Sequence, residues 1–115
     1  MADIISIATA VPEYCHRQND IIEFMAKVYK LDQQEKRKLS FLYKHSGIET
    51  RYSVIDDYSL PEHEWDFLPL NGNSFPSLEE RVKVFDVEAL KLSLKTVKKC
   101  IDGFITPNEI THLIQ

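Results

Sequence analysis

Two spacings of apolar residues alternate along this chain, and each predicts a different kind of element. Residues 3–10 are apolar on both sides of an extended chain, as in a strand that is buried inside a sheet. Pro12 ends that strand, and residues 12–17 show no regular pattern, so they predict a loop. The chain therefore opens with a predicted buried strand and a loop.

Helical spacing begins after Asn19, which suits the N-cap of a helix that we expect to end near Lys30. The residues that share one stripe of this helix predict a core-facing side; they are Ile21, Met25 and Val28.

A second helix is predicted from Asp32, which forms a capping box with Glu35, to about Ser46. Leu39 and Leu42 mark the side of this helix that we expect to be buried.

Gly47 stands where the second helix must stop, because glycine adopts the left-handed cap conformation without a Cβ clash. Period-two alternation then returns in residues 48–54, which predict a strand of β-branched and aromatic residues. Arg51 lies inside that strand, where its guanidinium must reach water, a carboxylate or carbonyl oxygens. The segment around Arg51 is therefore unusually informative.

Residues 55–76 combine acidic side chains with proline and glycine and contain no Lys or Arg, which predicts an irregular segment. Trp65 and Phe67 are costly to leave in water, so we expect this segment to dock on the fold through them. The carboxylates and His63 match no known metal-binding loop, and no metal site is predicted.

Ser77 and Glu80 form a second capping box, and the helix that follows is predicted to stop at Gly103. Apolar residues cover more than one side of this helix, which predicts burial against the chain's own sheet and against a further partner. Residues 106–109 predict a turn or short helix start, and residues 110–115 predict a final strand.

The two cysteines and the histidine of the final strand are candidates for chemistry. Cys15 and Cys100 are widely spaced and are expected to be reduced thiols. Cys100 lies near the end of a helix, where the dipole disfavours a thiolate, and the adjacency of Cys15 to His16 does not align their side chains. His112 is interpreted as a satisfied core residue, so we predict no catalytic residue.

Composition narrows the class of protein. The chain has 115 residues, 43% hydrophobic and 28% charged, as expected for one soluble globular domain at most. A net charge of −4 gives no sign of a nucleic-acid partner, and the apolar runs are too short for a bilayer. The N-terminus lacks the cationic and apolar features of a signal peptide, so the expected compartment is the cytoplasm.

Four segments together resemble one enzyme family. Residues 46–51 carry Ser-Gly-Ile-x-x-Arg, which resembles a segment of the condensing enzymes of the thiolase-like superfamily. Residues 4–12, 76–81 and 110–114 resemble the first strand, the Pro-Ser-Leu-x-x-Arg helix start and a later strand of chalcone synthase-like (type III) polyketide synthases. Members of that family are several-fold longer than this chain. The resemblance therefore implies an α/β fold, with residues 1–115 as the incomplete N-terminal part of the thiolase-like layered fold and strands at both ends and in the middle.

The same resemblance points to a coenzyme A contact on the second helix. In the family, cationic residues spaced i, i+3 and i+7 on this helix bind the phosphates of coenzyme A. The matching positions here are Lys38, Phe41 and His45. An imidazole is largely neutral near pH 7, and Lys44 points about 100° away around the helix. We therefore expect weak contacts through Lys38, Lys44 and His45 and no tightly bound cofactor; the alternative is a merely solvated basic surface.

For the longer parent protein, the resemblance implies acyl transfer from an acyl-CoA to a cysteine thiolate, followed by condensation with malonyl-CoA. In that family, a histidine and an asparagine stabilise the enolate and the oxyanion. No position here matches these three residues, so the 115 residues alone are expected to be inactive. Alternatives are a ketoacyl synthase III-like or hydroxymethylglutaryl-CoA synthase-like enzyme, or a non-enzymatic interaction module that dimerises.

The resemblance and the sequence also suggest a partner. The resembled family is dimeric, and residues 110–115 would end a sheet with unpaired backbone groups. The apolar helix that begins after Ser77 would also need a cover. We therefore expect a homodimer, or an oligomer that exchanges a strand or a helix, and no nucleic-acid or membrane partner.

Overall fold

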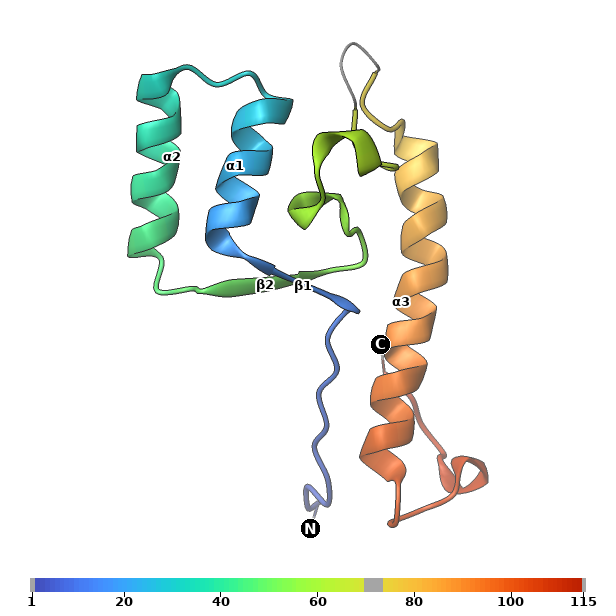
Figure 1. Cartoon of the computed structure of the whole chain (residues 1–115). Helices are drawn as coiled ribbons and strands as arrows, with labels where there is room; N and C mark the ends of the chain where they lie inside the picture. Colours follow the sequence, from blue (N-terminus) through green and yellow to red (C-terminus); the bar gives the residue numbers. More distant parts are fainter. Residues whose placement is uncertain (1, 70–73, 115) are drawn as a thin grey trace.

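Three helices and a small sheet make up the structure, a computed structural model that describes residues 2–69 and 74–114 (Figure 1). The regular elements, in chain order, are β1 (Tyr14–Arg17), α1 (Gln18–Val28), α2 (Gln33–His45), β2 (Thr50–Ser53), the 3₁₀ turns η1 (Asp57–Ser59) and η2 (Glu62–Glu64), α3 (Leu78–Ile101) and the 3₁₀ turn η3 (Pro107–Glu109). The mixed α/β class predicted from the sequence is confirmed.

The sheet consists of β1 and β2, which pair antiparallel with Tyr14 opposite Ser53 and Arg17 opposite Thr50. β2 lies within the predicted strand at residues 48–54, but β1 lies where a loop was predicted. The predicted first strand at residues 3–10 is wrong, since these residues have no regular structure. A strand needs a neighbour to take its backbone hydrogen bonds, and the part of the chain that the structure describes places no strand beside this segment.

The N-terminal segment instead follows the second half of α3. Lys99 Nζ donates to the carbonyl oxygen of Thr9 (3.2 Å), and Cys100 Sγ lies 3.7 Å from that of Ser6. Side-chain contacts therefore hold the segment where the sequence predicted a ladder of backbone bonds.

The start of α1 shows how tertiary structure replaces a local cap. Arg17 rather than Asn19 is the N-cap, and its side chain makes no capping bond. The backbone N–H of Gln18 instead donates to the carbonyl oxygen of Glu49 (2.9 Å). The chain entering β2 thus satisfies the first turn of α1, so the predicted cap at Asn19 is wrong.

The capping box of α2 is confirmed. Asp32 Oδ1 accepts from the backbone N–H groups of Gln34 and Glu35 (both 2.8 Å), and Glu35 Oε2 accepts from the N–H of Asp32 (2.9 Å). The burial predicted for α2 is only partly right, because Leu39 is half-buried whereas Leu42 is exposed. A pair of helices without a further layer leaves the outer half of α2 in water.

The core lies between α1 and the irregular segment that follows β2. Ile21, Ile22 and Phe24 of α1 are buried, while the predicted stripe members Met25 and Val28 are half-buried.

Aromatic rings dock the irregular segment on this core. The ring of Phe24 lies 4.9 Å from that of Tyr58 and 4.7 Å from that of Trp65, between ring centroids. Trp65 Nε1 also donates to the carbonyl oxygen of Leu60 (3.0 Å). Docking through Trp65 is therefore confirmed. Burial in the same cluster of rings raises the pKa of Tyr58. Residues 70–73 of the predicted loop lie outside the described residues.

A buried carboxylate organises the same segment. Asp57, 1% exposed, accepts from the backbone N–H groups of Asp66 (3.1 Å), Phe67 (3.0 Å) and Leu68 (2.6 Å). Three donors compensate for the loss of water around the charge. Asp57 therefore fixes the path of residues 66–68.

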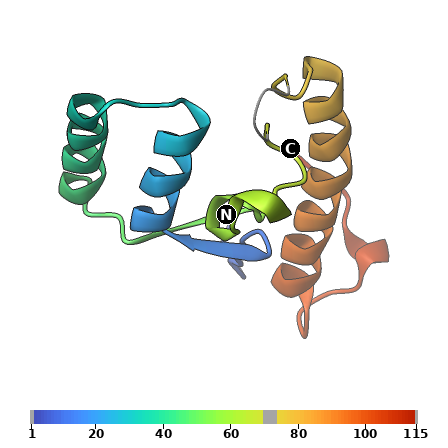
Figure 2. The same ribbon diagram turned by 45° about the horizontal axis from the view of Figure 1, so that its top comes forward.

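Helix α3 has the predicted start but not the predicted packing. Ser77 Oγ accepts from the N–H of Glu80 (3.2 Å), and Glu80 Oε2 accepts from the N–H of Ser77 (2.7 Å). The helix ends before Gly103, whose φ of +76° suits glycine. None of its residues, all of which the structure describes, is buried, and α3 stands apart from the α1–α2 pair (Figure 1, Figure 2). It does not pack on the chain's own sheet as predicted.

The predicted final strand is also wrong for the described residues 110–114, which form no regular structure; Gln115 lies outside them. His112 is exposed, and its Nδ1 lies 3.0 Å from Thr111 Oγ1, so it is not a core residue. The reason is again that residues 2–69 and 74–114 include no strand beside this segment. None of the helices in the described part of the chain is long and apolar enough to cross a bilayer.

Candidate functional site

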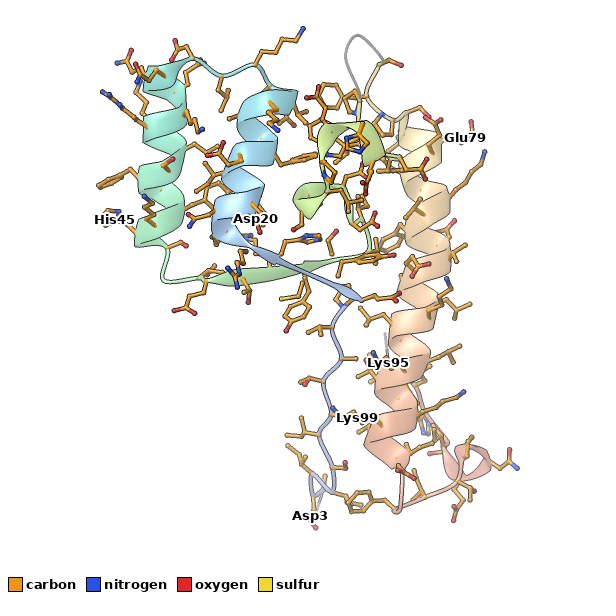
Figure 3. The ribbon with its side chains drawn as sticks, viewed as in Figure 1. Asp3, Asp20, His45, Glu79, Lys95 and Lys99 are labelled. Atoms are coloured by element: carbon orange, nitrogen blue, oxygen red, sulfur yellow. The ribbon has the colours of Figure 1, made fainter. Side chains whose placement is uncertain are left out.

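The outer face of α2 presents an aromatic pair next to a lysine. The ring centroids of Phe41 and His45 are 4.0 Å apart, with an interplanar angle of 30°. His45 Nδ1 donates to the carbonyl oxygen of Phe41 (2.8 Å), one helical turn back. Figure 3 shows His45 at the end of α2, on the side away from α1. Lys38 precedes Phe41 by three residues and so shares its face. We call these three residues the α2 face.

The cations around the α2 face differ in their availability. Lys36 Nζ forms an ion pair with Glu23 of α1 (2.7 Å), which fastens α2 to α1. Lys38 and Lys44 are exposed, and no carboxylate among the described residues pairs with either. The structure thus brings Lys38 and His45 together on one face. Lys44 follows the helical geometry and points about 100° away from His45.

Behind the end of α2, Gln18 joins three elements. Its side chain is buried, Oε1 accepts from Arg51 Nε (3.0 Å), and Nε2 donates to Ser46 Oγ (3.4 Å). The Arg51 guanidinium also lies 5.7 Å from the ring centroid of Tyr43, within cation–π range. The exposed guanidinium of Arg51 therefore contacts the amide oxygen of Gln18 and the ring of Tyr43, and also reaches water. Sequence reasoning missed Gln18, since nothing in the sequence links position 18 to position 51.

The Ser-Gly-Ile stretch forms the turn that follows α2. Ser46 Oγ donates to the carbonyl oxygen of Tyr43 (2.7 Å) and accepts from the N–H of Ile48 (3.2 Å). Gly47 has a φ of +70°, which glycine adopts without strain, as predicted. In this structure the Ser-Gly-Ile stretch has a structural role, because it fixes the end of α2 relative to β2.

The two cysteines lie in different environments. Cys15 is an exposed free thiol on β1, opposite Tyr52. The side-chain hydrogen bond between Cys15 and Tyr52 raises the pKa of Tyr52. Cys100 is a half-buried free thiol in the last turn of α3. Neither lies at a helix N-terminus, the position that stabilises a thiolate.

His16 cannot act on Cys15, because consecutive strand residues point to opposite faces. The ring of His16 is 2% exposed; its Nε2 donates to the carbonyl oxygen of Ile55 (2.9 Å), and its Nδ1 lies 2.6 Å from Ser59 Oγ. Both ring nitrogens are therefore occupied in holding the segment after β2. Within the described residues, no three His, Cys, Asp or Glu side chains are grouped as a metal site would require.

With this geometry in view, the chain can be compared with known proteins. The family model of the N-terminal domain of chalcone and stilbene synthases matches residues 1–115. The chain belongs to this family. Type III polyketide synthase C of Arabidopsis thaliana is 24% identical over 115 residues, which cover 98% of this chain and 29% of that protein. A search of solved structures gave no match.

Membership of the chalcone and stilbene synthase family confirms the resemblance noted in the sequence. The helices and the small sheet are consistent with the N-terminal part of the thiolase-like α/β fold. The match supports the type III polyketide synthase family. The chain spans 29% of the length of the curated relative, so the activity of a whole enzyme is a separate question.

Proposed function

We propose that this chain serves as the N-terminal part of a type III polyketide synthase, an acyltransferase that condenses an acyl-CoA with malonyl-CoA. The observation that carries the proposal is the family match over residues 1–115. Coenzyme A thioesters are then the substrates, and the chain holds no tightly bound cofactor.

The part proposed for these residues is to contact the nucleotide end of coenzyme A through the α2 face. Lys38 supports this role because it is exposed and without an ion-pair partner in the described chain. Lys44 adds a second positive charge nearby, and His45 adds a ring nitrogen. A point charge on an exposed helix gains little, and salt screens it over about 10 Å at roughly 0.1 M. The contact is therefore weak and depends on salt.

Acyl transfer needs a thiolate that attacks the thioester carbon and expels the thiolate of coenzyme A. A cysteine becomes such a nucleophile at a helix N-terminus or beside a cation. Cys15 lies on a strand, and Cys100 lies at the negative end of the α3 dipole. We therefore propose that these 115 residues supply binding and do not turn over substrate by themselves.

Isothermal titration calorimetry with coenzyme A at low and high ionic strength tests the binding role. The unsubstituted chain should bind weakly at low salt and lose most of its affinity at high salt. Lys38→Ala should weaken low-salt binding, whereas Lys95→Ala, an exposed lysine on the distant α3 (Figure 3), should leave it unchanged. Tight binding that ignores both salt and Lys38→Ala would contradict the proposal.

We also propose that two copies associate through α3. Among its exposed apolar side chains, Phe85 is 67% exposed, and Leu78 and Val82, which lie on the same side of the helix, are also exposed. An apolar surface of this kind favours association, and a two-fold dimer is the commonest closed solution. The exposed face of α3 supports this interpretation. The non-enzymatic interaction module remains the second candidate function, because it needs only this surface.

A further inference from the structure

Arg51 carries a charge that the fold positions but does not neutralise. Its Nε donates to Gln18 Oε1 (3.0 Å), and no carboxylate of the described residues forms an ion pair with it. Its Nη groups make no hydrogen bond within residues 2–69 and 74–114. A guanidinium stays charged at any physiological pH and holds its N–H donors in one fixed plane. The Nη donors of Arg51 are therefore available to a ligand.

A chain of hydrogen bonds sets the orientation of this guanidinium. Gln18 is 6% exposed, and its Nε2 donates to Ser46 Oγ (3.4 Å). Ser46 Oγ donates in turn to the carbonyl oxygen of Tyr43 (2.7 Å). The guanidinium also lies 5.7 Å from the centroid of the Tyr43 ring. A buried amide and a ring thus hold the charge in place before a ligand arrives, which lowers the ordering cost of binding.

Arg51 lines a cavity between the sheet and the two helices that precede β2 (Figure 1). The volume of this cavity is about 270 Å³, near the lower end for small-molecule sites. Ile21 and Met25 of α1 supply an apolar wall. No aspartate or glutamate is found among the described residues that line the cavity, and no residue of the α2 face lines it. The cavity is therefore separate from the surface proposed for coenzyme A.

Two tyrosines add neutral hydrogen-bond donors. Tyr43 and Tyr58 line the same cavity, and neither hydroxyl has a hydrogen-bond partner in the described part of the chain. Burial first, and then nearby acidic groups that include Tyr43, raise the pKa of Tyr58, so its phenol stays protonated near neutral pH. The charge of Asp57 is taken up by the N–H groups of residues 66–68. The cavity thus combines a cation and phenol donors with an apolar wall.

This combination matches a small organic acid. A carboxylate fits the guanidinium because its two oxygens accept two parallel N–H groups of the fork. The small volume and the apolar wall favour an apolar body on that carboxylate, and a phosphate would gain nothing from such a wall. We propose that the cavity binds a small apolar carboxylic acid as its anion, with the carboxylate on the Nη groups of Arg51 and the apolar part against Ile21 and Met25. The site does not depend on the proposed contact with coenzyme A.

Benzoate is the probe for this site, and benzyl alcohol is a neutral analogue of similar shape. In an NMR titration, the chain should bind benzoate about tenfold more tightly than benzyl alcohol, near the low end for hydrogen bonds to charged groups. The methyl signal of Met25 should shift and show nuclear Overhauser contacts with the benzoate ring. Equal affinity for both probes would overturn the proposal, because the charge of Arg51 would then play no part. Displacement of benzoate by an equal concentration of inorganic phosphate would refute the preference for an apolar acid.

Two substitutions separate binding from folding. Arg51→Gln removes the charge and should lower the affinity for benzoate about tenfold. Gln18→Glu keeps Arg51 but places a competing carboxylate at its Nε. This variant should also bind benzoate less tightly, without a lower urea midpoint by Trp65 fluorescence.

The matched control is Arg17→Gln, which changes an exposed arginine of β1 that does not line the cavity and should leave binding unchanged. The proposal is wrong if the unsubstituted chain does not bind benzoate. It is also wrong if the affinity survives both Arg51→Gln and Gln18→Glu.

Discussion

Asp57 should contribute more to stability than any other carboxylate in the described chain, because it is the one that is buried. Its Oδ2 accepts from the N–H groups of Phe67 and Leu68, and its Oδ1 accepts from that of Asp66. Hydrogen bonds to a charged group contribute about 1.5–3 kcal/mol each, and those to part-buried amides lie at the lower end. Asp57→Ala removes all three and should lower the free energy of unfolding by about 4–5 kcal/mol.

Asp57→Asn gives a graded change at the same position. The amide oxygen can keep the two bonds to Phe67 and Leu68, while its NH₂ group faces the N–H of Asp66 and the charge is lost. The expected loss is about 2 kcal/mol, roughly half that of the alanine variant.

Trp65 provides the assay, since it is the only tryptophan and lies against Phe24 in the core. Urea unfolding followed by its fluorescence measures the loss directly. The control is Asp56→Ala, an adjacent half-buried carboxylate that makes no side-chain bond in the described structure and should shift stability by less than about 0.5 kcal/mol. If Asp57→Ala unfolds at the same urea concentration as Asp56→Ala, the three N–H bonds do not hold the segment.

Three further predictions concern α3 and the catalytic activity of the chain. The Ser77 N–H bond lowers the pKa of Glu80 from 4.5, so its capping contribution is present above pH 4.5 and is lost as the pH falls through the lowered pKa. Carboxyl NMR titration should show a midpoint below 4.5 that Ser77→Ala moves upward, and a midpoint at or above 4.5 would refute the cap. Light scattering should show the mass rising with concentration to that of two copies, and Phe85→Glu should reduce this association; a monomer at every concentration would contradict it. Incubation with acyl-CoA and malonyl-CoA should release no coenzyme A above buffer, and release abolished by Cys15→Ala or Cys100→Ala would reveal a local cysteine mechanism.

The elements that the sequence predicted well are those fixed by neighbours along the chain. The capping boxes at Asp32 and Ser77 join residues three apart, and both formed as expected. Gly47 and Gly103 ended their helices because the left-handed conformation is a local property of the backbone.

The elements that it predicted badly depend on partners far away in the chain. Residues 3–10 and 110–114 have the composition of strands, but a strand forms only where another strand pairs with it. Conversely, β1 formed in a stretch without a pattern, because β2 lies beside it. The bonds of Gln18 with Arg51 and of Asp57 with residues 66–68 were likewise invisible, since a polar side chain does not reveal its partner.

For the candidate site, the sequence placed Lys38, Phe41 and His45 on one face through helical spacing alone, and α2 has that spacing. It could not show that Lys36 is paired with Glu23 while Lys38 is not, because the pairing follows from the packing of α2 on α1. The contact between the rings of Phe41 and His45 could also not be predicted from the sequence, because it depends on the side-chain conformations.

The most direct test of the proposed nucleotide contact is a residue-resolved amide NMR titration of the 115-residue chain with coenzyme A at low salt. We expect the shifted signals to cluster at Lys38, Phe41 and His45, with Lys44 shifted less and the signals of α3 unchanged. Shifts that are absent, or that cluster on α3 or around Cys15 while α2 stays unchanged, would contradict the assignment of the α2 face as the coenzyme A contact.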